Sequence, residues 1–131
     1  MDQGGKELVR RWTEAWIGND SSPVDALFSS QYTVNGQPVG REGVKKALRS
    51  LHRAFGELSL EINDLLAEGN KVAARWTVHG VHRGEFMGIA PTGRQIAVEG
   101  INIYQIAEGR ICANYEQTTF PSLVQELGAD P

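Results

Sequence analysis

The sequence contains a single cysteine, Cys112, so no disulfide can form within the chain. A chain without an internal disulfide is typical of a reducing compartment, and we expect a cytoplasmic protein. No apolar run approaches the roughly 20 residues that a membrane-spanning helix needs. The N-terminus also lacks the apolar core of a signal peptide. We therefore expect neither membrane insertion nor secretion.

Positive charge is also scarce: 13 Lys and Arg stand against 16 Asp and Glu, giving a net charge of -3 at pH 7. Without a basic stripe, nucleic acid is not an expected partner. Both common glycine-rich phosphate-binding patterns are absent, which argues against a nucleotide site. There is no HExxH motif or paired CxxC, and His79 and His82 would face opposite sides of a strand, so we expect no metal site. No GxSxG elbow occurs and Cys112 has no evident base, so nucleophilic catalysis is weakly supported.

The chain does contain enough apolar residues, 40% of 131, for a core and a cavity within one domain spanning residues 1–131. Its first part has helical periodicity. Leu8, Trp12, Ala15 and Trp16 form one apolar stripe that ends at the breakers of 18–23. A short helical turn is expected from Val24 to Phe28, then a brief strand at 32–34. A second helix is expected from about Arg41 to Phe55, ended by Gly56.

The period then changes to two, which is typical of strands. Alternation begins at Leu58, and Gly69-Asn70 predicts a tight hairpin. Further strands are expected near 72–79, 96–106 and 110–119, and a last short helix at 122–127. Helices followed by an antiparallel meander predict an α+β fold. We expect a curved antiparallel sheet with the helices packed against it.

With nucleotide sites, metal sites and nucleophilic catalysis disfavoured, acid–base chemistry in a pocket is the function class that remains. Glu116 lies in an otherwise apolar last strand and shares a strand face with Asn114 and Thr118. If that face lines a cavity, burial raises the pKa of the carboxyl and lets it exchange a proton near neutral pH. If the face is exposed, Glu116 is an ordinary solvated residue, and the strand alone leaves both interpretations open.

Other polar and aromatic residues are also ambiguous. Asn102 interrupts an apolar run and either orients a substrate oxygen or satisfies the backbone, and His82 is either a proton donor or a strand-edge histidine. Of Trp12, Trp16 and Trp76, we expect one or two to contact the cavity, because aromatics at helical spacing usually belong to the core. Arg75 and Glu99 are candidates for a cross-strand pair that merely stabilises the sheet.

Several segments together resemble the SnoaL-like polyketide (ester) cyclase family. These segments are KVAARWT at 71–77, HRGEFMGI at 82–89, PTGR at 91–94, GINIY at 100–104 and EGRI at 108–111, together with the first helix and residues 123–128. The resemblance covers nearly the whole chain. It implies the cone-shaped α+β fold of the nuclear transport factor 2-like superfamily, in which a curved antiparallel sheet wraps around helices and encloses an apolar cavity.

The resemblance also implies cofactor-free ring closure by intramolecular aldol condensation of a small apolar or aromatic substrate. The carboxylate position of the family falls on Glu116 and its histidine position near Asn102, which departs from the aspartate and histidine of the cyclases. His82 is the candidate for the missing histidine role, so the expected catalytic set is Glu116, Asn102 and His82. The expected substrate-binding residues are Trp12, Trp16, Trp76, Asn114 and Phe28.

The sequence leaves three alternatives open. Similar proteins hydroxylate polyketides or open epoxides, and for epoxide opening only Glu116, Glu99 and Arg75 are candidates. A ligand-binding module without catalysis is the third. The apolar outer strand face with Ala97, Ile101 and Ile103 needs a cover, so we expect a homodimer or homotetramer.

Overall fold

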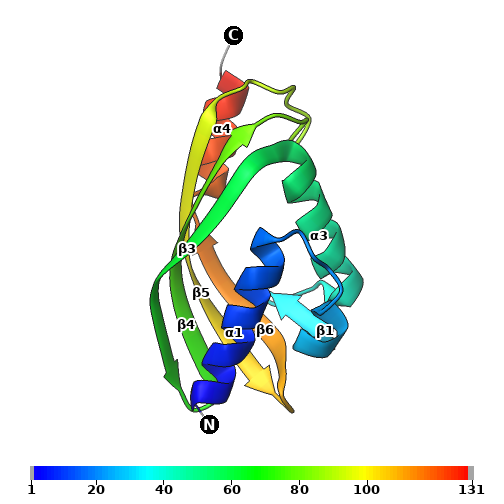
Figure 1. Ribbon diagram of the computed structural model, residues 1–131, viewed down its shortest axis with the longest axis vertical. Helices are drawn as coiled ribbons and strands as arrows, with labels where there is room; N and C mark the ends of the chain where they lie inside the picture. The colour runs from blue at the N-terminus through cyan, green and yellow to red at the C-terminus, as the bar shows by residue number, and fades with distance from the viewer. Residues whose placement is uncertain (1, 130–131) are drawn as a thin grey trace.

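The computed structural model describes residues 2–129 and has the expected α+β architecture, with helices first and a curved sheet after them (Figure 1). The elements in chain order are α1 (Asp2–Ile17), α2 (Val24–Leu27), β1 (Phe28–Val34), β2 (Gln37–Pro38), α3 (Gly40–Ala54), β3 (Phe55–Glu68), β4 (Lys71–His82), β5 (Gln95–Ala107), β6 (Arg110–Thr118) and α4 (Phe120–Ala129). Among the described residues, no helix is long and apolar enough to cross a membrane.

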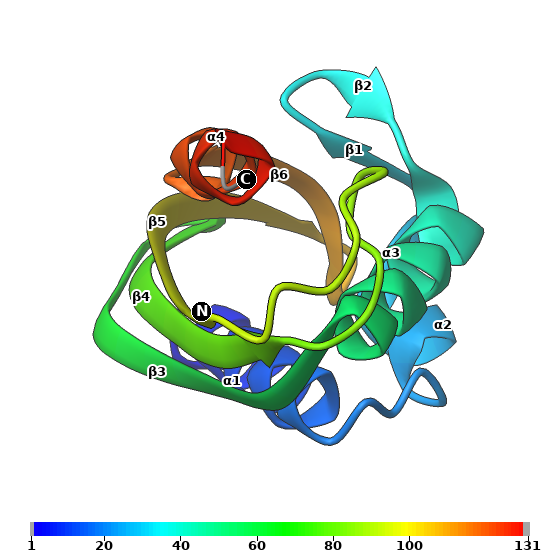
Figure 2. The same ribbon diagram turned by 90° about the horizontal axis from the view of Figure 1, so that it is seen from above.

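The strands form one six-stranded sheet in the order β2-β1-β6-β5-β4-β3. Seen from above, β3 to β6 trace an arc, and α3 lies across its open side (Figure 2). The meander from β3 to β6 is antiparallel as predicted, but β1 pairs with β6 in parallel. A hairpin fixes the direction of neighbouring strands, whereas β1 and β6 meet only through tertiary packing, so local sequence could not reveal this parallel pair.

The expected alternation along the strands is confirmed. In β4 and in most of β5, every second side chain is buried and its neighbours are exposed or partly exposed, as a period of two requires. The hairpin at Gly69-Asn70 is confirmed too, because Glu68 and Lys71 face each other across it. The buried side of this sheet is concave and faces the helices.

Three expected boundaries and one candidate cross-strand pair differ in the structure. Phe55 is the first residue of β3 and not the last residue of α3. Because Phe55 is buried, it continued the apolar pattern of the helix, and the expected helix was one residue too long. The first strand starts at Phe28 and the last helix at Phe120, both earlier than expected. Arg75 donates to Asp64 at 2.6 Å and lies opposite Ile101, not Glu99, because the strand register is set by pairing and by a bulge in β3.

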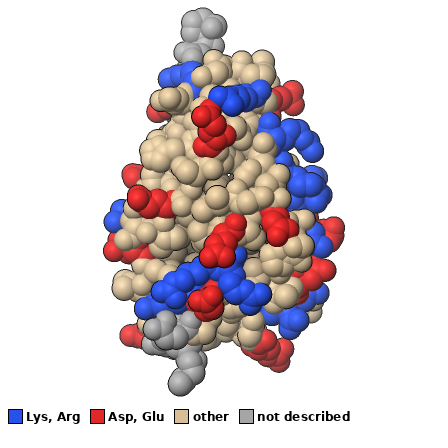
Figure 3. Space-filling model, viewed as in Figure 1, with Lys and Arg blue, Asp and Glu red and all other residues tan. Residues whose placement is uncertain are grey.

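Two clusters of buried apolar side chains stabilise the fold. One joins α1, α2 and β1 to the sheet around Val9, Leu27 and Phe28. The other joins α4 to the sheet through Leu123, Leu127 and their neighbours. On the face of the molecule in Figure 3, acidic and basic side chains are interspersed over its lower half.

Candidate active site

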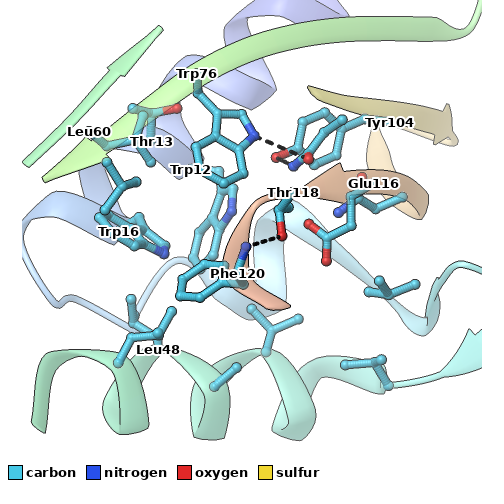
Figure 4. Close-up of a pocket in the computed structure, with 18 of the residues that line it drawn as sticks. Trp12, Thr13, Trp16, Leu48, Leu60, Trp76, Tyr104, Glu116, Thr118 and Phe120 are labelled. Carbon is cyan, nitrogen blue, oxygen red and sulfur yellow. Dashed lines mark hydrogen bonds between the residues drawn. The ribbon is translucent and has the colours of Figure 1, made fainter. Parts of the chain in front are cut away.

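A cavity of about 460 Å³ lies between the concave face of the sheet and helices α1 and α3. This volume is within the usual range of small-molecule sites. Aromatic and aliphatic side chains make most of its wall. They include Phe28 and the residues Trp12, Trp16, Leu48, Trp76 and Phe120, which are labelled in Figure 4. The cavity is therefore suited to a flat apolar body.

Polar groups gather on one part of this wall, where β5 and β6 lie side by side. Asn102 faces Glu116 across the two strands, and Tyr104 faces Asn114. Tyr32 of β1 joins these residues at the cavity wall. The pairing register therefore builds a compact polar patch from residues that lie up to 84 positions apart in the sequence.

Glu116 is the acidic group of this patch, and its carboxylate points into the cavity (Figure 4). The side chain is half-buried, and desolvation raises its pKa above the ordinary value of 4.5, with an opposing contribution from the Asn114 amide. The exposed interpretation of Glu116 therefore does not hold in this structure. A carboxyl with a raised pKa in an apolar cavity is chemically suited to accept and return a proton.

Asn35 fixes the backbone of Glu116. Its side-chain oxygen accepts from the Glu116 N–H at 2.9 Å, and its side-chain nitrogen donates to the Glu116 carbonyl at 3.2 Å. Asn35 has a left-handed φ of 50°, which asparagine tolerates better than most residues. The sequence has a turn pattern at Asn35-Gly36, but nothing in it indicates the contact of Asn35 with a strand 81 residues away.

Asn102 is held on both sides of its amide. Its oxygen accepts from the Trp76 indole N–H at 3.1 Å, and its nitrogen donates to the Tyr104 hydroxyl at 2.8 Å. Burial raises the pKa of Tyr104 to about 12 and also raises that of Tyr32, so both phenols are neutral near pH 7. The side-chain oxygen of Asn114 is buried without a hydrogen-bond partner among the described residues.

His82 lies outside the cavity wall. It ends β4, is fully buried, and packs its ring 5.5 Å from that of Phe55. Its Nδ1 accepts from the backbone N–H of Thr92 at 3.2 Å, and its Nε2 has no partner among the described residues. The structure thus does not bring His82 to Glu116, because residue 82 lies on the concave face but at the far end of the strand.

The structure brings together the other predicted site residues. All three tryptophans line the cavity, not one or two as expected, and Phe28 and Asn114 line it as well. Arg75 and Glu99 lie instead along a separate shallow hollow with Ile101 and Gln117. Tyr32 and Tyr104 were missed as site residues, since aromatic residues in an apolar run give no signal that their hydroxyls face a cavity.

Comparison with known proteins decides the family. Residues 6–127 match the SnoaL-like polyketide cyclase family. The chain belongs to this family. The aklanonic acid methyl ester cyclase DnrD of Streptomyces peucetius is 27% identical over 129 residues, covering 93% of this chain and 89% of the relative.

Solved structures share the fold of this chain. TsrD from Streptomyces laurentii superposes with a TM-score of 0.88 at 28% identity, covering 99% of each chain. AclR from Streptomyces galilaeus, described as a putative hydroxylase, has a TM-score of 0.85 at 26% identity, covering all of this chain and 89% of AclR. Proteins named for different reactions thus share this fold.

The raised pKa of Glu116 makes a prediction about pH and stability for this family member. The folded state favours the protonated form of the Glu116 carboxyl. Protonated Glu116 therefore stabilises the folded protein at a pH below the pKa that this group has in the unfolded chain. This stabilisation is lost as pH rises through the pKa of Glu116 in the folded protein. The Glu116→Gln protein stays neutral and lacks this loss. We expect the unfolding temperature of wild type to fall relative to Glu116→Gln as pH rises above the ordinary carboxyl pKa of 4.5. Parallel curves would show that the carboxyl is not desolvated.

Proposed function

We propose that this protein is a cofactor-free pocket enzyme that closes a ring in a polyketide-like carbonyl compound by an intramolecular aldol reaction. The observation that supports this best is the half-buried carboxylate of Glu116 on the wall of a largely apolar cavity. Membership of a cyclase family and the cyclase names of its relatives point the same way.

In this proposal Glu116 carries both proton transfers. Its carboxylate takes a proton from a carbon flanked by carbonyl groups, and the resulting enolate carbon attacks a second carbonyl of the same molecule. The new C–C bond closes the ring, and the carbonyl oxygen becomes a hydroxyl when the Glu116 carboxyl returns the proton. Because Asn102, which cannot exchange a proton, stands opposite Glu116, a single group performs both transfers.

Substrate binding is assigned to the remaining wall residues. Trp12, Trp16, Trp76 and Phe28 contact the flat apolar body of the substrate. The unpartnered oxygen of Asn114 accepts a hydrogen bond from a substrate hydroxyl, since leaving a buried acceptor unpaired is costly. The proposed substrate therefore combines a planar apolar framework with neighbouring carbonyl and hydroxyl groups.

The test is incubation of the purified protein with aklanonic acid methyl ester and, separately, with simpler polyketide ketones. Ring closure rearranges bonds without adding or removing atoms, so the expected product has the mass of the substrate but a different retention time and chirality. No rearranged product from any of these compounds, together with tight binding of them, would favour a ligand-binding module and contradict the proposal.

Hydroxylation is the second candidate, because AclR, a putative hydroxylase, resembles this chain in structure and at 26% sequence identity. The same mass measurement distinguishes it, since hydroxylation adds one oxygen atom and requires a reductant. Epoxide opening loses its support, because Arg75 and Glu99 do not line the cavity that contains Glu116.

We further propose that the protein forms a homodimer or homotetramer through the outer face of the sheet. Ile101, Ile103 and Tyr115 are 50%, 40% and 48% exposed on neighbouring strands. An apolar patch of this kind usually marks an interface. Replacing both isoleucines with lysine is expected to yield monomers in sedimentation velocity, and a wild-type monomer at high concentration would contradict the proposal.

A further inference from the structure

The hydroxyl of Tyr104 has an unused proton at the cavity wall. The ring is almost fully buried, and the residue lines the cavity beside the polar patch. The hydroxyl oxygen accepts one hydrogen bond, from the Asn102 side-chain nitrogen at 2.8 Å. Among the described residues, no group accepts a hydrogen bond from the hydroxyl itself. The hydrogen-bonding capacity of this buried hydroxyl is satisfied only when a ligand supplies the acceptor.

The direction of this hydrogen bond follows from Trp76. An indole N–H can only donate, so the Asn102 atom 3.1 Å from it is the side-chain oxygen. The side-chain nitrogen of Asn102 therefore faces Tyr104, and an amide nitrogen can only donate as well. The phenol must accept there, which leaves its own proton for another partner. The three side chains thus form an ordered relay from Trp76 through Asn102 to Tyr104.

Tyr104 also lies at the right place for the proposed reaction. It is the direct neighbour of Asn114 across β5 and β6, and Glu116 is the next inward-facing residue along β6. A substrate whose acidic carbon meets Glu116 therefore presents an adjacent carbonyl oxygen to this part of the wall. Because burial raises the pKa of Tyr104 to about 12, the phenol keeps its proton near neutral pH.

We propose that Tyr104 is a catalytic residue that donates a hydrogen bond to the enolate oxygen of the substrate, and that Asn102 and Trp76 are positioning residues that aim it. This inference rests on the proposed enolate chemistry, and it changes the role first expected for Asn102. Oriented neutral donors in a cavity stabilise developing negative charge without reorganisation at the moment of reaction.

The test uses naphthols of graded acidity, whose planar oxyanion resembles an enolate. Their affinities are measured by fluorescence titration in wild type and in Tyr104→Phe, each with and without Glu116→Gln to remove the neighbouring charge. We expect Tyr104→Phe to bind naphtholate about 10- to 100-fold more weakly, with a loss that grows as the naphthol becomes more basic. Damage to packing alone would weaken every naphthol equally, and equal affinity or a uniform loss would overturn the proposal.

Two further variants complete the design. Tyr115→Phe removes the hydroxyl of an exposed tyrosine on β6 and is expected to bind every naphthol as wild type does. Asn102→Leu removes the hydrogen bonds of Asn102 to Trp76 and Tyr104 but leaves the proton on the Tyr104 hydroxyl. In this variant, naphthol affinity is therefore expected to keep part of its dependence on naphthol basicity. If Asn102→Leu abolishes that dependence while Tyr104→Phe retains it, Asn102 is the donor and the proposal is wrong.

Binding of naphthols needs no turnover, so this test is independent of the reaction itself. Loss of activity in Glu116→Gln together with unchanged binding in Tyr104→Phe would reject only the role of Tyr104. Unchanged activity in Glu116→Gln would reject the proposed function, whatever the naphthols show.

Discussion

Replacing Glu116 with glutamine is expected to lower the rate of ring closure by about 10²- to 10⁴-fold, the usual contribution of a general acid–base group. Glutamine has nearly the same shape as glutamate but cannot accept or return a proton. Among the described residues, Glu116 is the only carboxylate of the polar patch, the opposite residue is Asn102, and His82 lies outside the cavity wall. The phenols of Tyr32 and Tyr104 have raised pKa values and stay protonated, so neither can act as the base. We therefore expect kcat to fall far more than KM rises.

The matched control is Glu99→Gln. Glu99 is an exposed carboxylate on β5 that belongs to the separate hollow, so its loss removes the same charge without touching the cavity. Rates are followed by chromatographic separation of substrate and product, with thermal unfolding as a check on folding. Full activity in Glu116→Gln would exclude Glu116 from the chemistry, and an equal loss in Glu99→Gln would point to a general effect of charge.

Adding one methyl group at Gly100 is expected to destabilise the protein by about 1–3 kcal/mol, as overpacking of a filled core does. Gly100 lies opposite Trp76 in the sheet, and a Cβ there would stand 2.5 Å from the indole atom Cζ2 and 2.9 Å from the backbone oxygen of Gln117. The φ angle of Gly100 suits any residue, so the cost comes from the collision alone. The indole must shift, and its hydrogen bond to Asn102 is then lost.

Gly4→Ala is the control variant, in which the same substitution is expected to raise stability. Gly4 lies in α1, and an added Cβ would meet no atom within 4 Å apart from the adjoining backbone of its own helix, so alanine is expected to stabilise the helix by up to about 1 kcal/mol. Both changes are measured by urea denaturation, and Gly100→Ala is also tested for naphthol binding, which we expect to weaken. Wild-type stability and binding in Gly100→Ala would show that the sheet yields easily and that Trp76 is not tightly held.

Most of the fold was predictable because its signals are local. The alternation in β4 and β5 and the Gly69-Asn70 turn each identify an element from a few neighbouring residues. What failed depended on distant partners. The parallel pairing of β1 with β6 and the partner of Arg75 are set by tertiary packing and by a bulge, which leave no trace in a short stretch of sequence.

The candidate site divides in the same way. Glu116 was recognisable as a carboxylate in an apolar strand, and the tryptophans as large apolar groups. Tyr104 was hidden, because the sequence shows an aromatic residue where a core is expected and says nothing about its hydroxyl. His82 attracted attention by its chemistry alone, and only the structure shows that its position along β4 lies beyond the cavity wall.

The most direct test of this account is a titration of the Glu116 carboxyl itself, followed by the carbon-13 NMR signal of its side chain and assigned by comparison with Glu116→Gln. A pKa clearly above 4.5 is expected, because the folded protein desolvates this group. A pKa at or below 4.5 would mean that the carboxylate is well solvated or paired, and would contradict a proton-exchanging group held in an apolar cavity.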